Sequence, residues 1–186
     1  MLTPAEFELA WGDDLIPLVA FPEDHLRDAA VSEENRRFLA EAGLPEDAAP
    51  FLSFGPPPED ARTLPEMWGL PAEYAKYTVI GGNGSGDPIV VMPDGAVACL
   101  NHDDGMAEMY INRNVPVLAE TLLRFRNLIA EAQRIGGPGA YWDAAVPAGL
   151  QREFRDFLFA ADPRACEPDT LWGAEMRGWE SRQAGG

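Results

Sequence analysis

The stretch of residues 77–111 constrains the fold more than any other part of the chain. Four short apolar runs, rich in Val and Ile, alternate there with segments of Gly, Asn, Asp and Pro. β-branched residues favour the pleated surface of a sheet, and Gly or Asn provides the positive φ that tight turns need. We therefore expect an antiparallel meander of neighbouring strands, at residues 77–81, 88–92, 96–100 and 109–111.

The sequence before this meander contains helical start and stop signals. Thr3, followed by Pro4 and Glu6, has the pattern of a capping box at a helix N-terminus. A short helix should start at residues 22–25, and Ser32 begins a longer one that Gly43 should end. Residues 51–54 form a further short strand, because their apolar run is too brief for a helix.

The sequence after the meander predicts three helices. The most periodic segment, residues 115–135, follows Asn114 and repeats apolar residues every three or four positions, at Val115, Leu118, Leu122, Phe125, Ile129 and Ala132. Residues 147–161 and a segment capped by Asp169 or Thr170 form the other two. We predict an α+β fold with a central antiparallel or mixed sheet flanked by helices. Residues 1–186 form one domain, and residues 136–139 (Gly-Gly-Pro-Gly) are its one candidate break.

The charge balance excludes several classes of partner. The chain has 186 residues, with 31 Asp and Glu against 14 Lys and Arg, and its formal net charge is −17. Because nucleic acids and membrane surfaces are negatively charged, we expect neither as a partner, whereas a basic protein would be attracted. The acids are concentrated before residue 74, where 16 acids face four arginines. A general role in solubility is the competing explanation.

The N-terminus and the cysteines indicate a reducing compartment. The first residues contain acids where a signal peptide needs bases, and no apolar run is long enough to span a bilayer. Cys99 and Cys166 lie far apart, and we expect both to be free thiols. These features predict a cytoplasmic protein.

Residues 81–86 (Gly-Gly-Asn-Gly-Ser-Gly) resemble a phosphate loop or, with Asp87, a calcium loop. A phosphate loop needs a following helix and often a Lys, but Asp87, Pro88 and a predicted strand follow here. A calcium loop needs Gly at its sixth position and Glu at its twelfth, and this segment has neither. We expect a structural hairpin loop that binds neither nucleotide nor metal, and we expect no cofactor.

The loop after the third apolar run contains His102, Asp103 and Asp104, and Glu108 follows it. A His beside carboxylates could serve as a general base or a metal ligand. The chain has only one other His, however, and no Ser or Cys lies in a nucleophile motif. We predict no catalytic residues. The candidate partner-binding residues are Asp103, Asp104 and Glu108, with Asp87 near the other turn, because the core does not need their charges.

Several segments, in order along the chain, resemble the fourth immunity-protein family of the SUKH superfamily. They are Gly43-Leu-Pro45, Phe51-Leu-Ser-Phe54, residues 79–89 through the Gly-rich loop, residues 95–97, Asn101-His-Asp103 and Tyr110-Ile-Asn112. The helix at residues 118–123 matches as well, so the resemblance covers about residues 15–126. The family usually has small residues after the position of Asn112, where this chain has Arg113 and Asn114.

The resemblance implies a non-enzymatic protein with the fold of the yeast cell-wall regulator, a mixed sheet flanked by helices. It also implies a bacterial antidote, encoded beside a polymorphic toxin, that binds the toxin and blocks its site. We therefore expect a cytoplasmic immunity protein against a basic toxin that acts on nucleic acid. The alternatives are a regulatory or scaffold module of the same fold without a toxin partner, and a small hydrolase.

Overall fold

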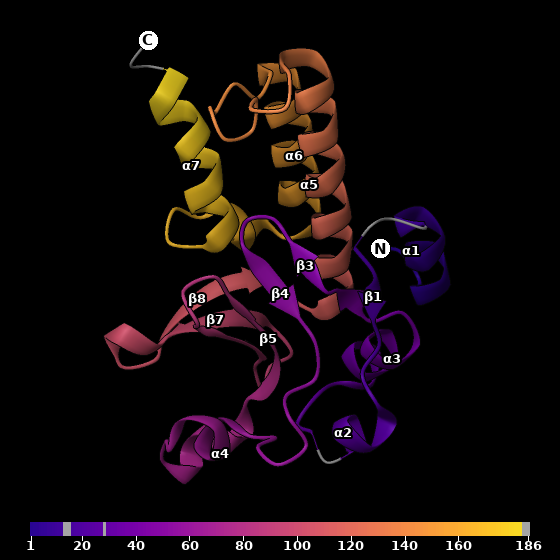
Figure 1. Ribbon diagram of the computed structural model, residues 1–186, viewed down its shortest axis with the longest axis vertical. Helices are drawn as coiled ribbons and strands as arrows, with labels where there is room; N and C mark the ends of the chain where they lie inside the picture. Colours follow the sequence, from indigo (N-terminus) through magenta and orange to yellow (C-terminus); the bar gives the residue numbers. More distant parts are fainter. Residues whose placement is uncertain (13–15, 28, 184–186) are drawn as a thin grey trace.

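The computed structural model of the protein describes residues 1–12, 16–27 and 29–183. These residues form the helices and strands of an α+β fold, as predicted. Figure 1 shows the sheet beside the N-terminal helices, with the three C-terminal helices extending away from it along the long axis of the molecule.

The main sheet is antiparallel throughout, and its strands follow chain order. They are β3 (Asp47–Ala48), β4 (Leu52–Phe54), β5 (Thr78–Asn83), β6 (Pro88–Val91), β7 (Val97–Asn101) and β8 (Ala107–Asn112). The four strands β5 to β8 confirm the predicted meander, and β4 confirms the predicted short strand. Every described strand pair is antiparallel, so the mixed alternative is wrong. A separate pair joins β1 (Leu18–Val19) to β2 (Leu44–Pro45).

Close packing of two strands explains why the first residue of the Gly-rich segment, Gly81, is a Gly. A Cβ added to Gly81 would lie 2.1 Å from the backbone oxygen of Ser53, so β4 and β5 can approach closely only if this residue is Gly. The register between β5 and β6 shifts between Val79 and Gly81, which forms a β-bulge.

Helices surround the sheet. They are α1 (Pro4–Trp11), α2 (Glu23–Arg27), α3 (Glu33–Glu41), α4 (Leu64–Trp68), α5 (Val115–Gly136), α6 (Ala148–Ala161) and α7 (Leu171–Gln183), with the short 3-10 helices η1 (Ala72–Lys76), η2 (His102–Asp104) and η3 (Pro163–Cys166). Thr3, Ser32 and Asn114 cap α1, α3 and α5 through their side chains, as predicted. Thr170, rather than Asp169, caps α7, because its hydroxyl accepts a hydrogen bond from a backbone N–H of the first turn.

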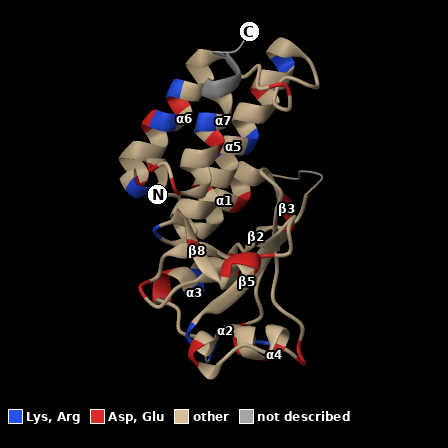
Figure 2. Cartoon of the chain, turned by 90° about the vertical axis from the view of Figure 1, so that its left-hand side faces the viewer, with Lys and Arg blue, Asp and Glu red and all other residues tan. Residues whose placement is uncertain are grey.

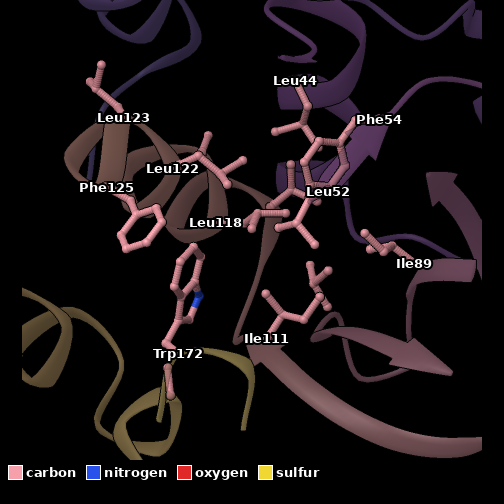
Figure 3. Close-up of a cluster of buried hydrophobic side chains, with 14 of the residues drawn as sticks. Leu44, Leu52, Phe54, Ile89, Ile111, Leu118, Leu122, Leu123, Phe125 and Trp172 are labelled. Carbon is pink, nitrogen blue, oxygen red and sulfur yellow. The ribbon is translucent and has the colours of Figure 1, made fainter. Parts of the chain in front are cut away.

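The main core lies between one face of the sheet and α5. Figure 3 shows Leu118, Leu122 and Phe125 of α5 facing side chains from the strands and from α7, and all three are buried as expected. Ile129 is only half-buried, and Leu128, three residues after Phe125 and so on the same side of the helix, is buried instead. Other buried members of this core are Leu52, Phe54, Ile89, Ile111, Trp172, Met176 and Trp179.

The opposite face of the sheet has a smaller apolar cluster, made of Leu64, Tyr77, Val79, Val90 and Leu100. Its members come from α4, from the end of η1 and from the strands. Because side chains alternate along a strand, Val90 points to this face while Ile89 points to the main core. The segment of α4 and η1 therefore covers the face of the sheet that α5 does not.

Two buried polar residues join distant parts of the chain. Asn35 of α3 donates to the carbonyl of Gly95, 3.0 Å away, and accepts from the backbone N–H of Val115, 2.9 Å away. Asp162 accepts from the hydroxyl of Tyr110 and from the backbone N–H of Arg113, the latter at 2.7 Å. The first residue holds α3 to the sheet and to α5, and the second holds the end of α6 to β8.

Cys99 is buried and Cys166 is half-buried, and both are free thiols, as expected. Among the described residues, no helix combines the length and the apolar character that crossing a bilayer would require.

Candidate partner-binding site

Two turns of the sheet bring the predicted site residues together at one end. Asp87 lies directly before β6, and His102 directly after β7. Because β6 and β7 are antiparallel neighbours, with Ile89 opposite Cys99, the start of one strand lies beside the end of the other. This pairing places Asp87 next to the acidic turn at residues 102–104.

Asp87 is the centre of a hydrogen-bond network inside this end of the sheet. Its Oδ1 accepts from the backbone N–H of His102 at 3.0 Å and lies 2.6 Å from Nδ1 of the same residue. Its Oδ2 accepts from Nδ2 of Asn83 at 2.9 Å. Asn83 in turn accepts, through Oδ1, from the backbone N–H groups of Ser85 and Asp87. The Gly-rich loop and the acidic turn are therefore held to each other by one carboxylate.

The environment keeps Asp87 ionised. Burial alone would raise the pKa of Asp87, but the hydrogen bonds from His102 and Asn83 outweigh it and leave this pKa below its ordinary value. An ionised carboxylate can only accept, so Nδ1 of His102 carries the proton between the two groups. Asp87 is buried, and its charge is used inside the protein rather than presented at the surface.

Asp103 and Asp104 have the opposite environment. Both are exposed, and 88% of the Asp103 side chain is accessible. The turn that carries them begins with an Asn101 side chain that accepts from the N–H of Asp103 and continues through Gly105 in the left-handed region. Nε2 of His102 lies 3.4 Å from Oδ1 of Asp103. The turn thus presents two carboxylates to solvent, while hydrogen bonds to the side chains of Asp87 and Asn101 fix its backbone.

Glu108 lies on β8, a few residues beyond this turn. It is exposed, and its Oε1 accepts a hydrogen bond of 2.8 Å from the hydroxyl of Tyr77. Burial, together with this hydrogen bond to a carboxylate, raises the pKa of Tyr77 to about 12. Tyr77 therefore stays neutral and holds the Glu108 carboxylate in place on the α4 side of the sheet.

Sequence reasoning did not identify Trp68 as part of this site. The Trp68 ring lies 5.3 Å from the His102 ring, centroid to centroid, although 33 residues lie between them in the chain. Trp68 and its neighbour Met67 are both partly exposed. No local pattern could have paired them with His102, because the contact depends on how α4 folds back over the sheet.

Two observations bear on metal binding and nucleophilic chemistry at this site. Within the part of the chain that the structure describes, no group of three or more His, Cys, Asp or Glu side chains could hold a metal ion. Cys99 accepts a weak hydrogen bond from Asn83, but burial and the nearby Asp87 charge raise its pKa to about 12. A thiol with such a pKa is a poor nucleophile at neutral pH.

One protein-family model matches the chain. It is described as SUKH-4 immunity protein, and the match covers residues 2–177. Comparison with curated proteins and with solved structures gives no significant match. The family match includes the sheet, the acidic turn, α5, α6 and the first half of α7, so it extends well past residues 15–126. The chain belongs to the SUKH-4 immunity protein family.

Proposed function

We propose that this protein binds one copy of a basic toxin domain that acts on nucleic acid, and that it neutralises the toxin by covering its working surface. The observation that carries the proposal is the exposed acidic turn, where Asp103 and Asp104 stand on a backbone held by the buried Asp87. Within this proposal the protein acts in the cytoplasm of a bacterium and performs no catalysis of its own.

The distribution of charge supports a basic partner. Residues 1–112, which include the whole sheet, contain 21 acids and 5 Lys or Arg, whereas residues 113–186 contain 10 acids and 9 Arg. Figure 2 shows the basic residues mixed with acids on the C-terminal helices, while few basic residues occur around the sheet. A toxin that binds phosphate groups carries positive charge at its working surface, so this half of the protein would attract it at long range.

The rigidity of the turn supports the same reading. Ordering a loop during binding costs free energy that the contacts must offset. Here the network of Asp87, Asn83 and His102 already fixes the turn, and Tyr77 fixes Glu108. Of the four predicted binding residues, Asp103, Asp104 and Glu108 are proposed to face the toxin. Asp87 is proposed to position them, because it is buried.

The test measures association with the purified, inactivated toxin domain encoded beside this gene. Replacing Asp103 and Asp104 by Asn should slow association several-fold at low salt, and the difference should shrink as salt screens the charges. The dissociation rate should change less. The matched control replaces Glu153 and Asp156, two exposed acids of α6, by Gln and Asn, which changes the net charge equally away from the turn.

Two results would count against the proposal. Association of the unmodified protein that is equally fast at low and high salt would exclude electrostatic steering by the acidic turn. Failure of the unmodified protein to protect cells that express the neighbouring toxin, or the absence of a toxin gene beside this one, would exclude the toxin partner.

A further inference from the structure

Two exposed aromatic side chains meet where the β3–β4 turn approaches the C-terminal helices. Phe51 is 67% exposed and Trp142 is 57% exposed, and their ring centroids lie 5.5 Å apart. Phe51 belongs to the β3–β4 turn, and Trp142 to the loop between α5 and α6; Figure 1 shows this hairpin pointing toward that helical half. Paired, exposed aromatic rings are typical of the residues that dominate binding energy at protein interfaces.

Each side of this pair borders a hollow. One hollow, of about 320 Å³, is lined by Phe51, Tyr141, Trp142, Glu175 and Trp179, among others. The second, of about 340 Å³, also includes Phe51 and continues over the sheet to Met109 and Leu171. Phe51 therefore stands between two concave, mainly apolar surfaces, which is the shape that receives protruding side chains of a partner.

Two further features of this region are energetically unfavourable. Trp179 is 2% exposed, and its Nε1 is the one buried side-chain nitrogen or oxygen among the described residues that has no hydrogen-bond partner. An unpaired buried donor is costly, and such groups usually find an acceptor. Phe51 has φ of +60°, in the left-handed region that bulky residues avoid. The unpaired donor and the positive φ of Phe51 each lower the stability of the folded protein.

The charges around the surface define what fits it. Of the residues that line the two hollows, Glu175 is the only charged one, and it holds the hydroxyl of Tyr141 at 2.9 Å. Asp143, next to Trp142 in the chain, is exposed. The faces of aromatic rings attract cations, and a guanidinium group can stack on a ring while it binds a carboxylate. A second copy of this chain, with its charge of −17, would be repelled.

We propose that this aromatic surface, defined by Phe51, Tyr141, Trp142, Glu175 and Trp179, receives a loop of the toxin that carries an Arg. The guanidinium lies against the Phe51 and Trp142 rings and binds Glu175. This inference rests on the proposed function and adds a second contact surface to it. The acidic turn sets the association rate, whereas the aromatic surface sets the dissociation rate.

The test uses the same purified, inactivated toxin domain and two variants, Phe51→Gly and Trp142→Ala. Each should weaken binding at least about tenfold, mainly through faster dissociation, as truncation of a buried aromatic anchor does. The matched control is Phe159→Ala on α6, because Phe159 is 63% exposed and lines neither hollow. This control should bind within about twofold of the unmodified protein.

Phe51→Gly separates binding from folding. Gly adopts φ of +60° without strain, so the urea midpoint of this variant should not fall far below that of the unmodified protein. If the midpoint does fall, Phe51→Gly cannot separate binding from folding, and the test is Trp142→Ala combined with an Arg→Ala scan of the toxin. One toxin Arg should then lose most of its effect on binding when Trp142 is already Ala.

The outcomes distinguish this inference from the proposed function. If the unmodified protein binds and neutralises the toxin while Trp142→Ala and Phe51→Gly bind equally well, the aromatic surface is wrong and the proposed function stands. The same conclusion follows if no toxin Arg couples to Trp142. If the unmodified protein does not bind the toxin at all, both proposals fail together.

Discussion

Replacing Asn35 by Ala should destabilise the protein strongly, although Asn35 is one small polar residue. The side chain is fully buried and makes two hydrogen bonds to backbone groups far away in the chain, at Gly95 and Val115. Ala would leave the N–H of Val115 without an acceptor and the carbonyl of Gly95 without this donor. Both groups are enclosed by α3, the β6–β7 turn and the start of α5.

The expected loss follows from the cost of unpaired buried groups. Each buried donor or acceptor left without a partner costs about 1–3 kcal/mol. Two such groups predict a loss of about 2–6 kcal/mol in the free energy of unfolding, before the small void left by the amide is counted. This is a large part of the 5–15 kcal/mol that is typical of a folded protein. Arg37→Ala, on the exposed side of the same helix, removes only a surface ion pair with Glu41 and should cost less than about 0.5 kcal/mol.

Equilibrium urea unfolding, followed by tryptophan fluorescence, gives both values. Native-state hydrogen exchange adds a local measurement, because the amide of Val115 should lose protection in Asn35→Ala more than amides in the middle of α5 do. A loss below about 1 kcal/mol, with unchanged exchange at Val115, would refute the reasoning. It would mean that water replaces the Asn35 side chain and satisfies both backbone groups.

Three further predictions address the core, the site and the Gly-rich loop. Leu122→Ala should cost about 2–5 kcal/mol in urea unfolding, as truncation of a buried Leu does, and a loss below about 0.5 kcal/mol would contradict the burial of this face. The lowered pKa of Asp87 stabilises the folded state at pH values above the ordinary carboxyl pKa, and this contribution is lost as the pH falls through the folded-state pKa. The difference in unfolding free energy between the unmodified protein and Asp87→Asn should therefore be constant above about pH 5 and shrink below pH 4, and a constant difference down to pH 2 would disprove the assignment. Residues 82–86 should bind neither ATP nor calcium, so calorimetry at millimolar concentration should show only heats of dilution; a saturable isotherm would overturn this.

The sequence predicted those parts of the fold that depend on neighbouring residues. The meander was predicted because its turns are specified locally by Gly, Asn, Asp and Pro, and the caps at Thr3, Ser32 and Asn114 were predicted because a cap depends on only a few consecutive residues. The two-residue strands β2 and β3 were not, because strands this short have no periodicity and exist only through their partners. That the chain forms one domain stays a prediction.

The site was predicted less completely, because its contacts join residues that are distant in the chain. The exposure of Asp103 and Asp104 fits a polar loop, but the burial of Asp87 follows from its pairing with His102, 15 residues later. The ring of Trp68, at the end of α4, contacts the ring of His102, which follows β7. Phe51 and Trp142 are separated by 90 intervening residues, and each would be expected in a core if judged by its type alone.

The carboxylate of Asp162 has a consequence for when this protein can fold during its synthesis. Tyr110, Arg113 and Asn112 depend on it for hydrogen bonds, and the side chain of Asn112 also accepts from Trp172, near the end of the chain. While α6 and α7 are still inside the ribosome, the polar groups of β8 that bind Asp162 and Trp172 have no partners. The apolar face of α5 that packs against α6 and α7 is also uncovered. Stable folding therefore waits until Trp172 has emerged from the ribosome, and a ribosome that stalls before that point yields no stably folded protein.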